Sequence, residues 1–417
     1  MAQRKECFPD GTSIDEWFYD VRTPNLEMLG TRYVITDYGV LDDGKVYTKE
    51  IQMLIDLAAK TGGVIFVPKG TYRTGALFFK QGVNLYIEEN GVLMGSDDIS
   101  DYPLCETRIE GESCRYFSAL INVDGTDGFT MFGKGVIDGN GLRSWRAFWK
   151  RLEWNPKATN KDEQRPRLVY ISNSSNVTIS GVTLQNSHFW TSHIYRCNRV
   201  RYLNCRFLSP NAPVRAPSTD GIDVDACSDV LIKGCYFAVN DDAVAFKGGK
   251  GPTADKMPIN GANERILIED CNYGFCHSCL TLGSESIHNK NILARRLKVS
   301  NPVAVFVLKI RPDTPQWYEY VTIEDVNGEI NTFLRISSWK QYFDMQGVQE
   351  LPWHIVENIV VRNCACVCDQ DVRVVGEECL KDIKNFRIEN VKLKTKEKGF
   401  DLKPLNGFIF DDVTIFE

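Results

Sequence analysis

A β-rich phrase recurs every 23 to 38 residues over the last two thirds of this 417-residue chain. Most copies begin with Asn, Asp or Arg, continue with β-branched or aromatic residues in alternation, and turn at Gly, Asn or Asp. The copies start at Asn176, Arg199, Asp229, Arg265, Asn291, Tyr320, Asn358, Asn385 and Phe408. Short strands at such a period, without helical patterns between them, are typical of a solenoid whose coils bury a core by stacking. We therefore predict an all-β fold, a right-handed single-stranded parallel β-helix of roughly ten coils.

One clear helical pattern precedes this array, over residues 48–60. Ile51, Leu54, Ile55 and Ala58 follow the i, i+3, i+4, i+7 spacing of an amphipathic helix. A helix there would cover the open end of the solenoid, whose terminal coil otherwise exposes unpaired strand edges. Because no flexible linker or composition shift divides the chain, we predict one domain over residues 1–417, with an N-terminal cap at about residues 30–65.

Composition limits the classes of binding partner and the cellular location that we expect. A net charge of −6 argues against nucleic acid, and no apolar run approaches the length of a membrane span. The first residues, MAQRKECFPDG, contain no apolar segment of the signal-peptide kind. We expect a secreted or periplasmic protein if a signal peptide has been removed from this chain; otherwise the sequence leaves the location undetermined.

The 14 cysteines are placed as core residues rather than as a disulfide framework. Cys205, Cys235, Cys271 and Cys364 occupy the same position in their phrases, where a small side chain would stack from coil to coil. The CxxC pair Cys276 and Cys279 and the pair Cys105 and Cys114 leave other pairings open. We favour mostly free thiols without a metal or redox role.

Three aspartates lie at the spacing of one coil. Asp220 precedes the pair Asp241-Asp242 by 21 residues, with one turn-and-strand segment between them. Neighbouring parallel strands lie about 4.8 Å apart, so one circuit of the chain would gather these carboxylates on one face. Crowded carboxylates repel, which raises at least one pKa and keeps a proton available. A held proton facing an ionised carboxylate is what cleavage of a glycosidic bond requires.

Four motifs in this order resemble glycoside hydrolase family 28, the polygalacturonase-like enzymes. The family's Asn-Thr-Asp, Asp-Asp, Gly-His-Gly and Arg-Ile-Lys correspond to Ser218-Thr219-Asp220, Asp241-Asp242, Cys276-His277-Ser278 and Lys309-Ile310-Arg311. Segments such as GGVIFVPKGTYRTGALFF and GKGVIDGNG match as well, and the resemblance extends to about Asp344.

The resemblance implies an inverting hydrolase of α-linked, galacturonate-containing pectic polysaccharide or oligosaccharide, of the polygalacturonase, exo-galacturonidase or rhamnogalacturonan type. Asp241 would be the general acid, and Asp220 and Asp242 would hold and deprotonate the attacking water. His277 would tune the protonation or orientation of the acid. Inverting sites usually hold their carboxyl groups roughly 6.5–9.5 Å apart. No cofactor and no metal is expected, and we expect a monomer.

Basic and aromatic residues complete the predicted site. Lys309 and Arg311 are two apart in a strand and therefore share a face, where they would bind a uronate carboxylate beside the cleavage point. Lys247 begins an insertion that would wall off one end of the cleft, which favours exo action or oligosaccharide specificity. Tyr342 falls where the family often has a tyrosine that contacts substrate.

Two points stay open. Trp190 and His193, one coil before the first acid, would either line the sugar site or fill the core. Strand alternation points Asp242 inward and Asp241 and Lys247 outward. A bend must therefore turn both acids outward, or else Asp242 is a buried structural acid.

Two other functional classes are compatible with a β-helix. A pectate-lyase-like enzyme would need a calcium-binding acidic cluster beside an arginine, for which Asp223 and Asp225 supply acids. A non-catalytic carbohydrate-binding protein would turn over no pectic fragment. The order of the four motifs favours the hydrolase.

Overall fold

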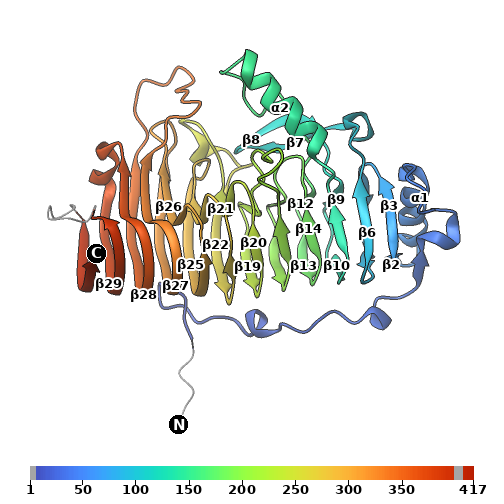
Figure 1. The fold of residues 1–417 in the computed structure, drawn as a ribbon, viewed down its shortest axis with the longest axis horizontal. Helices are drawn as coiled ribbons and strands as arrows, with labels where there is room; N and C mark the ends of the chain where they lie inside the picture. Colours follow the sequence, from blue (N-terminus) through green and yellow to red (C-terminus); the bar gives the residue numbers. More distant parts are fainter. Residues whose placement is uncertain (1–5, 399–406) are drawn as a thin grey trace, which may run out of the picture.

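The computed structural model describes residues 6–398 and 407–417, which form a right-handed parallel β-helix (Figure 1). The predicted fold is confirmed. We expected no apolar segment of the signal-peptide kind at the start of the chain. The first five residues of that segment lie outside the described residues. Of the helices in the described part, none has the length and apolar character needed to span a membrane.

The strands form three parallel stacks that run the length of the molecule. The first stack comprises β1 (Arg32–Val34), β2 (Gly63–Val67), β5 (Val83–Ile87), β10 (Thr130–Gly133), β13 (Ser175–Ser180), β16 (Asn198–Leu203), β19 (Ser228–Lys233), β22 (Ala262–Glu269), β25 (His288–Ser300), β27 (Gln316–Ser338), β28 (His354–Val375), β29 (Ile383–Glu397) and β30 (Phe408–Phe416). The second comprises β3 (Gly70–Thr74), β6 (Gly91–Gly95), β11 (Val136–Asp138), β14 (Thr183–Gln185), β17 (Arg206–Leu208), β20 (Tyr236–Ala238) and β23 (Asn272–Tyr273), and continues into β25.

The third stack carries the candidate site on its outer face. It comprises β4 (Leu77–Phe79), β9 (Ile121–Asp124), β12 (Val169–Ser172), β15 (Ser192–Tyr195), β18 (Ile222–Asp225), β21 (Asp242–Lys247), β24 (Ser278–Leu282) and β26 (Ala304–Ile310), and continues into β27 and β28. Its consecutive members place residues from distant parts of the sequence side by side.

The recurring phrases have a backbone cause. In eight of the nine copies the first residue has a positive φ, from 49° at Asn385 to 57° at Arg199 and Arg265. The left-handed region is accessible at low cost to Asn and Asp, which explains their frequency at this bend. Asn358 and Asn385 also stack, since the Asn385 amide donates to the Asn358 side-chain oxygen at 2.8 Å.

The interior is a set of ladders of like side chains. The rings of Phe207, Phe237 and Tyr273 stack with centroids 4.8 and 5.3 Å apart. Cys205, Cys235, Cys271 and Cys364 are buried and carry free thiols. The cysteine ladder is therefore confirmed. Cys105 and Cys114, for which a loop-closing bond stayed open, are both free thiols.

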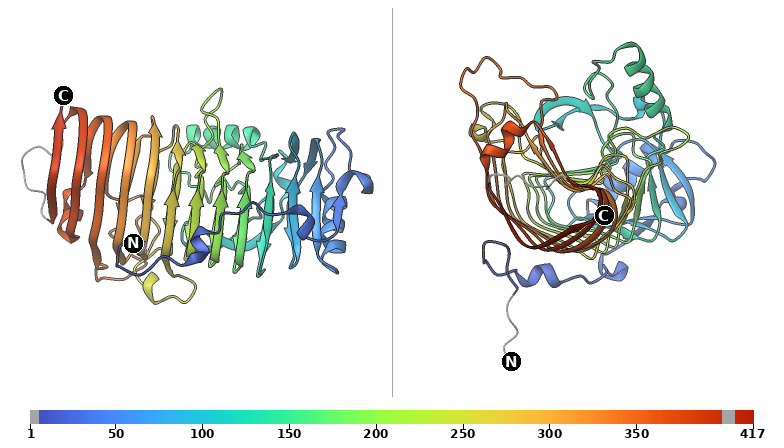
Figure 2. Two further views of the ribbon diagram at one scale, coloured as in Figure 1. Left: turned by 90° about the horizontal axis from the view of Figure 1, so that it is seen from below. Right: turned by 60° about the vertical axis from the view of Figure 1, so that its left-hand side comes forward.

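Several elements lie outside the coils. The helices are α1 (Thr48–Ala58), α2 (Leu142–Trp154), and the short 3₁₀ turns η1 (Glu16–Tyr19), η2 (Leu26–Met28), η3 (Ile35–Tyr38), η4 (Ile99–Asp101), η5 (Ala254–Lys256) and η6 (Glu377–Asp382). Helix α1 covers the N-terminal end, as predicted. Helix α2 and the antiparallel hairpin β7 (Leu104–Ile109)–β8 (Glu112–Phe117) were not predicted, and both stand above the coils (Figures 1 and 2).

The N-terminal segment runs as a strap along the outside of the coils, from the later coils back to α1 (Figure 2). Phe8, Ile14 and Phe18 of this strap pack against leucines of four consecutive coils, Leu203, Leu231, Leu267 and Leu293. The strap thereby ties successive coils together from outside.

Candidate active site

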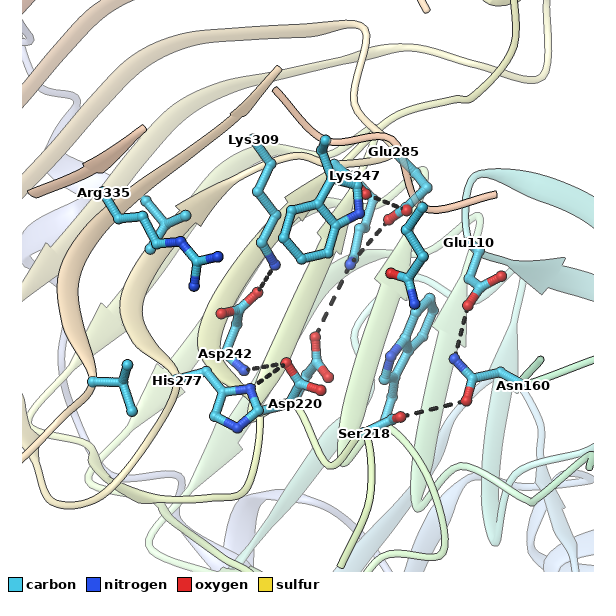
Figure 3. A pocket seen from close by; sticks show the side chains of 17 residues that line it. Glu110, Asn160, Ser218, Asp220, Asp242, Lys247, His277, Glu285, Lys309 and Arg335 are labelled. Carbon is cyan, nitrogen blue, oxygen red and sulfur yellow. Dashed lines mark hydrogen bonds and ion pairs between the residues drawn. The ribbon is translucent and has the colours of Figure 1, made fainter. Parts of the chain in front are cut away.

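A cleft of about 440 Å³ lies on the outer face of the third stack. This volume is within the range of about 300–1,000 Å³ that is usual for small-molecule sites. Figure 3 shows its lining, with Asp220, Asp242, His277, Lys309 and Arg335 directed toward a common space. Asp241, Lys247 and Trp190 line the same cleft.

The three predicted aspartates meet in this cleft. Asp220 lies just before β18, and Asp241 lies just before β21, which begins at Asp242. One carboxylate oxygen from each lies within 4.8 Å of the other two. The Asp242 carboxylate turns to the cleft, where Ser278 Oγ donates to it at 2.8 Å and Lys309 Nζ at 2.6 Å. The expected bend is therefore present.

The three carboxylates differ in exposure. The Asp241 side chain is 27% exposed, whereas those of Asp220 and Asp242 are 5% and 3% exposed. Asp241 is therefore the carboxyl group best placed to meet a ligand atom, and the other two lie deeper in the wall.

His277 contacts Asp241 from the next coil. Its Nδ1 lies 3.3 Å from Asp241 Oδ1, and its backbone N–H donates to the Asp241 carbonyl at 2.9 Å. Arg215 approaches the other ring nitrogen, with NH2 2.9 Å from Nε2. A guanidinium can only donate, so this contact favours the neutral ring with its proton on Nδ1, facing Asp241.

Burial and charge separate the pKa values of these groups. Burial, followed by the charges of Asp241 and Asp223, raises the pKa of Asp220 well above its usual value. Burial alone would also raise the pKa of Asp241, but the hydrogen bond and charge of His277 and the charge of Lys309 outweigh it and lower that pKa. Of these two carboxyl groups, Asp220 is therefore the one that favours its protonated form and Asp241 the one that favours its ionised form.

His277 responds in the opposite sense. Burial opposes its charged form, but the hydrogen bond that His277 donates to Asp241 and the charges of Asp241 and Asp242 outweigh burial and raise the pKa of His277. The charge of Arg215 counteracts this rise. Arg215 thus acts against protonation of His277 through both its geometry and its charge.

Lys247 lies among three acids. Its Nζ is 3.4 Å from Glu285, 3.6 Å from Asp223 and 4.0 Å from Asp220. Its ammonium also lies 5.0 Å from the centre of the Trp190 ring. These charges, against the effect of burial, raise the pKa of Lys247.

The prediction that Arg311 faces the substrate is wrong. Strand β26 ends at Ile310, so the alternation that would place Arg311 beside Lys309 stops one residue early. Arg311 is fully buried and makes two hydrogen bonds of 2.8 Å to Asp313, and it also donates to the Tyr342 carbonyl. Arg311 therefore anchors the loop that follows β26. Its acidic partner, Asp313, lies two residues further along the chain and was not identified from the sequence.

His193 and Tyr342 also lie away from the acids. His193 is fully buried between Arg167, at 2.7 Å, and Asp225, at 3.3 Å, because hairpin β7–β8 covers this part of the third stack. Tyr342 lines a neighbouring hollow, where its ring lies 5.8 Å from Lys250 Nζ. Neither residue lines the cleft that contains the three aspartates.

Several residues that line the cleft were not predicted from the sequence. Glu110, at the tip of the hairpin, accepts from Asn160 at 2.8 Å, and the Asn160 side-chain oxygen accepts from Ser218 at 3.4 Å. These residues form the right-hand wall in Figure 3. No repeat phrase contains Glu110 or Asn160, so only the folded insertions bring them here. Arg335 lies on the opposite side in Figure 3, and Trp339 lines the cleft with its ring centre 4.7 Å from Lys309 Nζ.

The acids that a calcium-dependent lyase would need are neutralised. Asp225 is paired with Arg108 of the hairpin at 2.7 Å, with both side chains 1% exposed, and Asp223 lies 3.6 Å from Lys247. Within residues 6–398 and 407–417, the carboxylates grouped closely enough to hold a cation are Asp220, Asp241 and Asp242. Lys309 and Lys247 already lie against two of these, which opposes a further cation.

Comparisons with known proteins place this geometry in a family. The family model described as Glycosyl hydrolases family 28 matches residues 80–303, which contain all three aspartates and His277. A probable polygalacturonase of Vitis vinifera is 29% identical over 227 residues, 52% of this chain and 44% of that protein. An exo-poly-alpha-D-galacturonosidase of Dickeya chrysanthemi is 26% identical over 303 residues, 60% of this chain and 47% of that protein. The chain spans about half the length of the curated relatives it matches.

A solved structure supports the fold over the whole chain. The exopolygalacturonase of Thermotoga maritima superimposes with a TM-score of 0.77 at 22% identity, covering 96% of this chain and 95% of that one. Because the family model covers more than half of this chain and includes the clustered aspartates, the chain belongs to glycosyl hydrolases family 28.

Proposed function

We propose that this protein is an inverting glycoside hydrolase that cleaves α-linked, galacturonate-containing pectic chains. The observation that carries the proposal is the meeting of three carboxylates with cationic side chains in one cleft. A glycosidic bond needs a proton donor and an activated water, and an acidic sugar needs a cation. The relatives named polygalacturonase and exo-poly-alpha-D-galacturonosidase support this substrate class.

The proposed roles follow from position. Asp241, the most exposed of the three acids, donates a proton to the leaving oxygen. Asp220 and Asp242 accept the proton of a water held between them, and that water attacks the anomeric carbon. Lys309 Nζ donates to Asp242 at 2.6 Å and orients its carboxylate. His277 positions Asp241 through Nδ1.

In this proposal, binding of the substrate favours protonation of Asp241, the general acid. His277 and Lys309 lower the pKa of Asp241, which favours its ionised form. A bound uronate adds negative charge and excludes water, and both effects raise the pKa of a nearby carboxyl group. The proton favoured at Asp220 would pass to Asp241 through one water that bridges the two carboxyl groups, whose oxygens lie within 4.8 Å of each other.

The spacing of the carboxylates differs from the usual one. We expected a separation of roughly 6.5–9.5 Å for inversion, whereas one oxygen of each acid lies within 4.8 Å of the others. Three acids share this site, and two of them are assigned to the same water, so the site holds one carboxylate more than the pair to which that range applies. The stereochemical outcome is therefore tested directly: fresh product should show inverted configuration by NMR, and a retained anomer would refute the roles of Asp220 and Asp242.

We further propose that the enzyme acts from a chain end. Support comes from the wall of Glu110, Asn160 and Ser218 at one end of the cleft, and from the hairpin tip that packs against Gly249 and Glu285. An enclosed end accommodates a terminal sugar but obstructs a continuing chain. Exo action predicts mono- or disaccharide products from the first turnover, with a slow fall in viscosity.

The proposed function is tested by incubating the protein with homogalacturonan, rhamnogalacturonan and their oligosaccharides in the presence of a chelator. Saturated products identified by mass would support hydrolysis. Unsaturated, ultraviolet-absorbing products would indicate a lyase, and no turnover on any fragment would indicate a binding protein. We also propose that the protein is a monomer and acts where pectic polymer is found, outside the cytoplasm. Light scattering and cell fractionation test these two points.

A further inference from the structure

Arg335 is an arginine that lines the active-site cleft. It lies in the part of β27 that extends the third stack, between the buried residues Leu334 and Ile336. Strand alternation therefore turns its side chain outward. Figure 3 shows the guanidinium directed to the space beside Asp242 and Lys309.

The two other cations that line the cleft already have acidic partners, as does the buried Arg311. Lys309 is paired with Asp242 at 2.6 Å, Lys247 with Glu285 at 3.4 Å, and Arg311 with Asp313 at 2.8 Å. A cation held this closely by its own acid has little charge left for a ligand.

Arg335 lacks such a partner. Its Nε donates to Ser337 Oγ at 3.2 Å, and in the part of the chain that the structure describes no carboxylate forms an ion pair with it. Its two terminal amino groups are therefore available as a planar fork, which matches the two oxygens of a carboxylate. A half-buried guanidinium without an acid, in a cleft, indicates an anionic ligand.

The next coil places a second arginine opposite the first. Arg373 of β28 is the Cα partner of Arg335, so the two side chains project from the same face of neighbouring strands. Burial and the charge of Arg373 lower the pKa of Arg335. Like charges opposite each other on neighbouring strands are unfavourable, and an anion between them would relieve the repulsion.

We propose that Arg335, supported by Arg373, forms the carboxylate-binding subsite of the cleft, the role that the sequence had suggested for Arg311. Strand β27 lies three strands beyond β21, in the order β21, β24, β26, β27. At about 4.8 Å per strand, the carboxylate bound there belongs to a sugar beside the scissile bond and not to the ring that reacts. The inference rests on the proposed pectic substrate and specifies how the acid group is recognised.

Binding to a catalytically inert protein tests this subsite separately from turnover. The Asp241→Asn variant is titrated by calorimetry with trigalacturonate and with its methyl ester, which has the same backbone without the charges. Adding Arg335→Gln should reduce the preference for the acid over the ester by roughly ten- to a hundredfold, the effect of one charge-assisted contact. Arg335→Lys keeps the positive charge but not the planar guanidinium, so it should retain part of the preference for the acid.

A matched control removes an arginine elsewhere. Arg362→Gln changes a partly exposed residue of β28 that pairs with Glu324 in the first stack, and it should leave the preference unchanged. Salt provides a measurement without any change at Arg335: sodium chloride should weaken binding of the acid much more than binding of the ester. If Arg335→Gln does not fold, this measurement shows whether the cleft recognises the charge of the ligand, and a weaker salt effect in Arg335→Lys assigns that recognition to the guanidinium fork.

Three results would overturn the subsite. They are equal losses for acid and ester in Arg335→Gln, equal salt effects on both ligands, and no binding of trigalacturonate by the inert parent. A parent that binds trigalacturonate through Arg335, while the unsubstituted protein hydrolyses no pectic substrate, would instead refute the proposed function and leave the carboxylate subsite in place.

Discussion

Asp241 is the residue at which the chemistry of the cleft can be tested most directly. We predict that Asp241→Asn lowers kcat by roughly a hundredfold or more, since a proton donor contributes about this much. The thermal midpoint should stay close to that of the parent, because the Asp241 side chain is partly exposed and removing it opens no cavity.

The control for Asp241→Asn is Asp255→Asn, which changes an exposed aspartate of η5 and should leave kcat unchanged. Near-parental rates in Asp241→Asn would assign the proton donor to another carboxyl group, with Asp220 the first alternative because its pKa is raised.

Asp223 connects the charge cluster to the stability of the fold. It is fully buried, and neither of its carboxylate oxygens has a hydrogen-bond partner among the described residues. Burial and the charges of Asp241 and Asp242 raise its pKa to about 7 from 3.8, against the effect of Lys247. The folded state therefore binds this proton more tightly than the unfolded state.

A raised folded pKa means that the contribution of Asp223 is fully present below about pH 4 and is lost as the pH rises toward 7. We predict that Asp223→Asn removes this loss. Relative to the parent, the thermal midpoint of the variant should increase between pH 5 and pH 7.5 in differential scanning fluorimetry. A difference that stays constant over this range would show that Asp223 does not titrate there.

At the scale of elements, hairpin β7–β8 determines the shape of the cleft. Its tip residue Gly111 has a φ of +74°, and a Cβ there would come within 2.9 Å of Glu285 Cβ and of the Gly249 carbonyl carbon. The buried pair of Arg108 and Asp225 fixes the tip end of the hairpin on β18. Tip and coil are therefore packed without space for a side chain.

We predict that Gly111→Ala displaces the hairpin tip and opens the walled end of the cleft. Longer fragments should then appear among the early products of homogalacturonan, as seen by mass spectrometry. Gly125→Ala is the matched control, because Gly125 has a similar φ of +64° but no atom within 4 Å of the new Cβ. The same product pattern in Gly111→Ala and parent would exclude the hairpin as the barrier to internal cleavage.

For the whole molecule, the strap along the outside links coils that contact one another only in sequence order. Phe18 is 1% exposed and packs in the cluster with the leucine ladder. We predict that Phe18→Ala costs about 3–5 kcal/mol of local stability, the usual range for a buried phenylalanine. Hydrogen exchange should accelerate in residues 6–30 while the strands of the third stack stay protected.

Met28→Ala serves as the control for Phe18→Ala, since Met28 lies further along the same segment but is 81% exposed. Unchanged exchange in the strap of Phe18→Ala would mean that its polar contacts, such as Glu6 to Arg295 at 2.7 Å, suffice to hold it.

The repeat itself could be predicted from the sequence because each coil obeys local rules. Asn176, Asn291 and Asn358 mark bends that need a positive φ, and alternating apolar residues mark the inward face. The same period brings Asp220 to Asp241 and Asp242, since one circuit of a parallel coil places its ends on neighbouring strands. The fold and the acid cluster were therefore determined by the sequence alone.

The remainder of the site depends on where the coils are interrupted. Arg311 lies outside the cleft because β26 ends at Ile310. His193 lies outside it because a hairpin distant in sequence covers β15. Arg335, from a later coil, lines the cleft beside Lys309, whose charge is already paired with Asp242. Strand ends, insertions and ion pairs are set by contacts between distant segments, so only the tertiary structure decided which charges face the substrate.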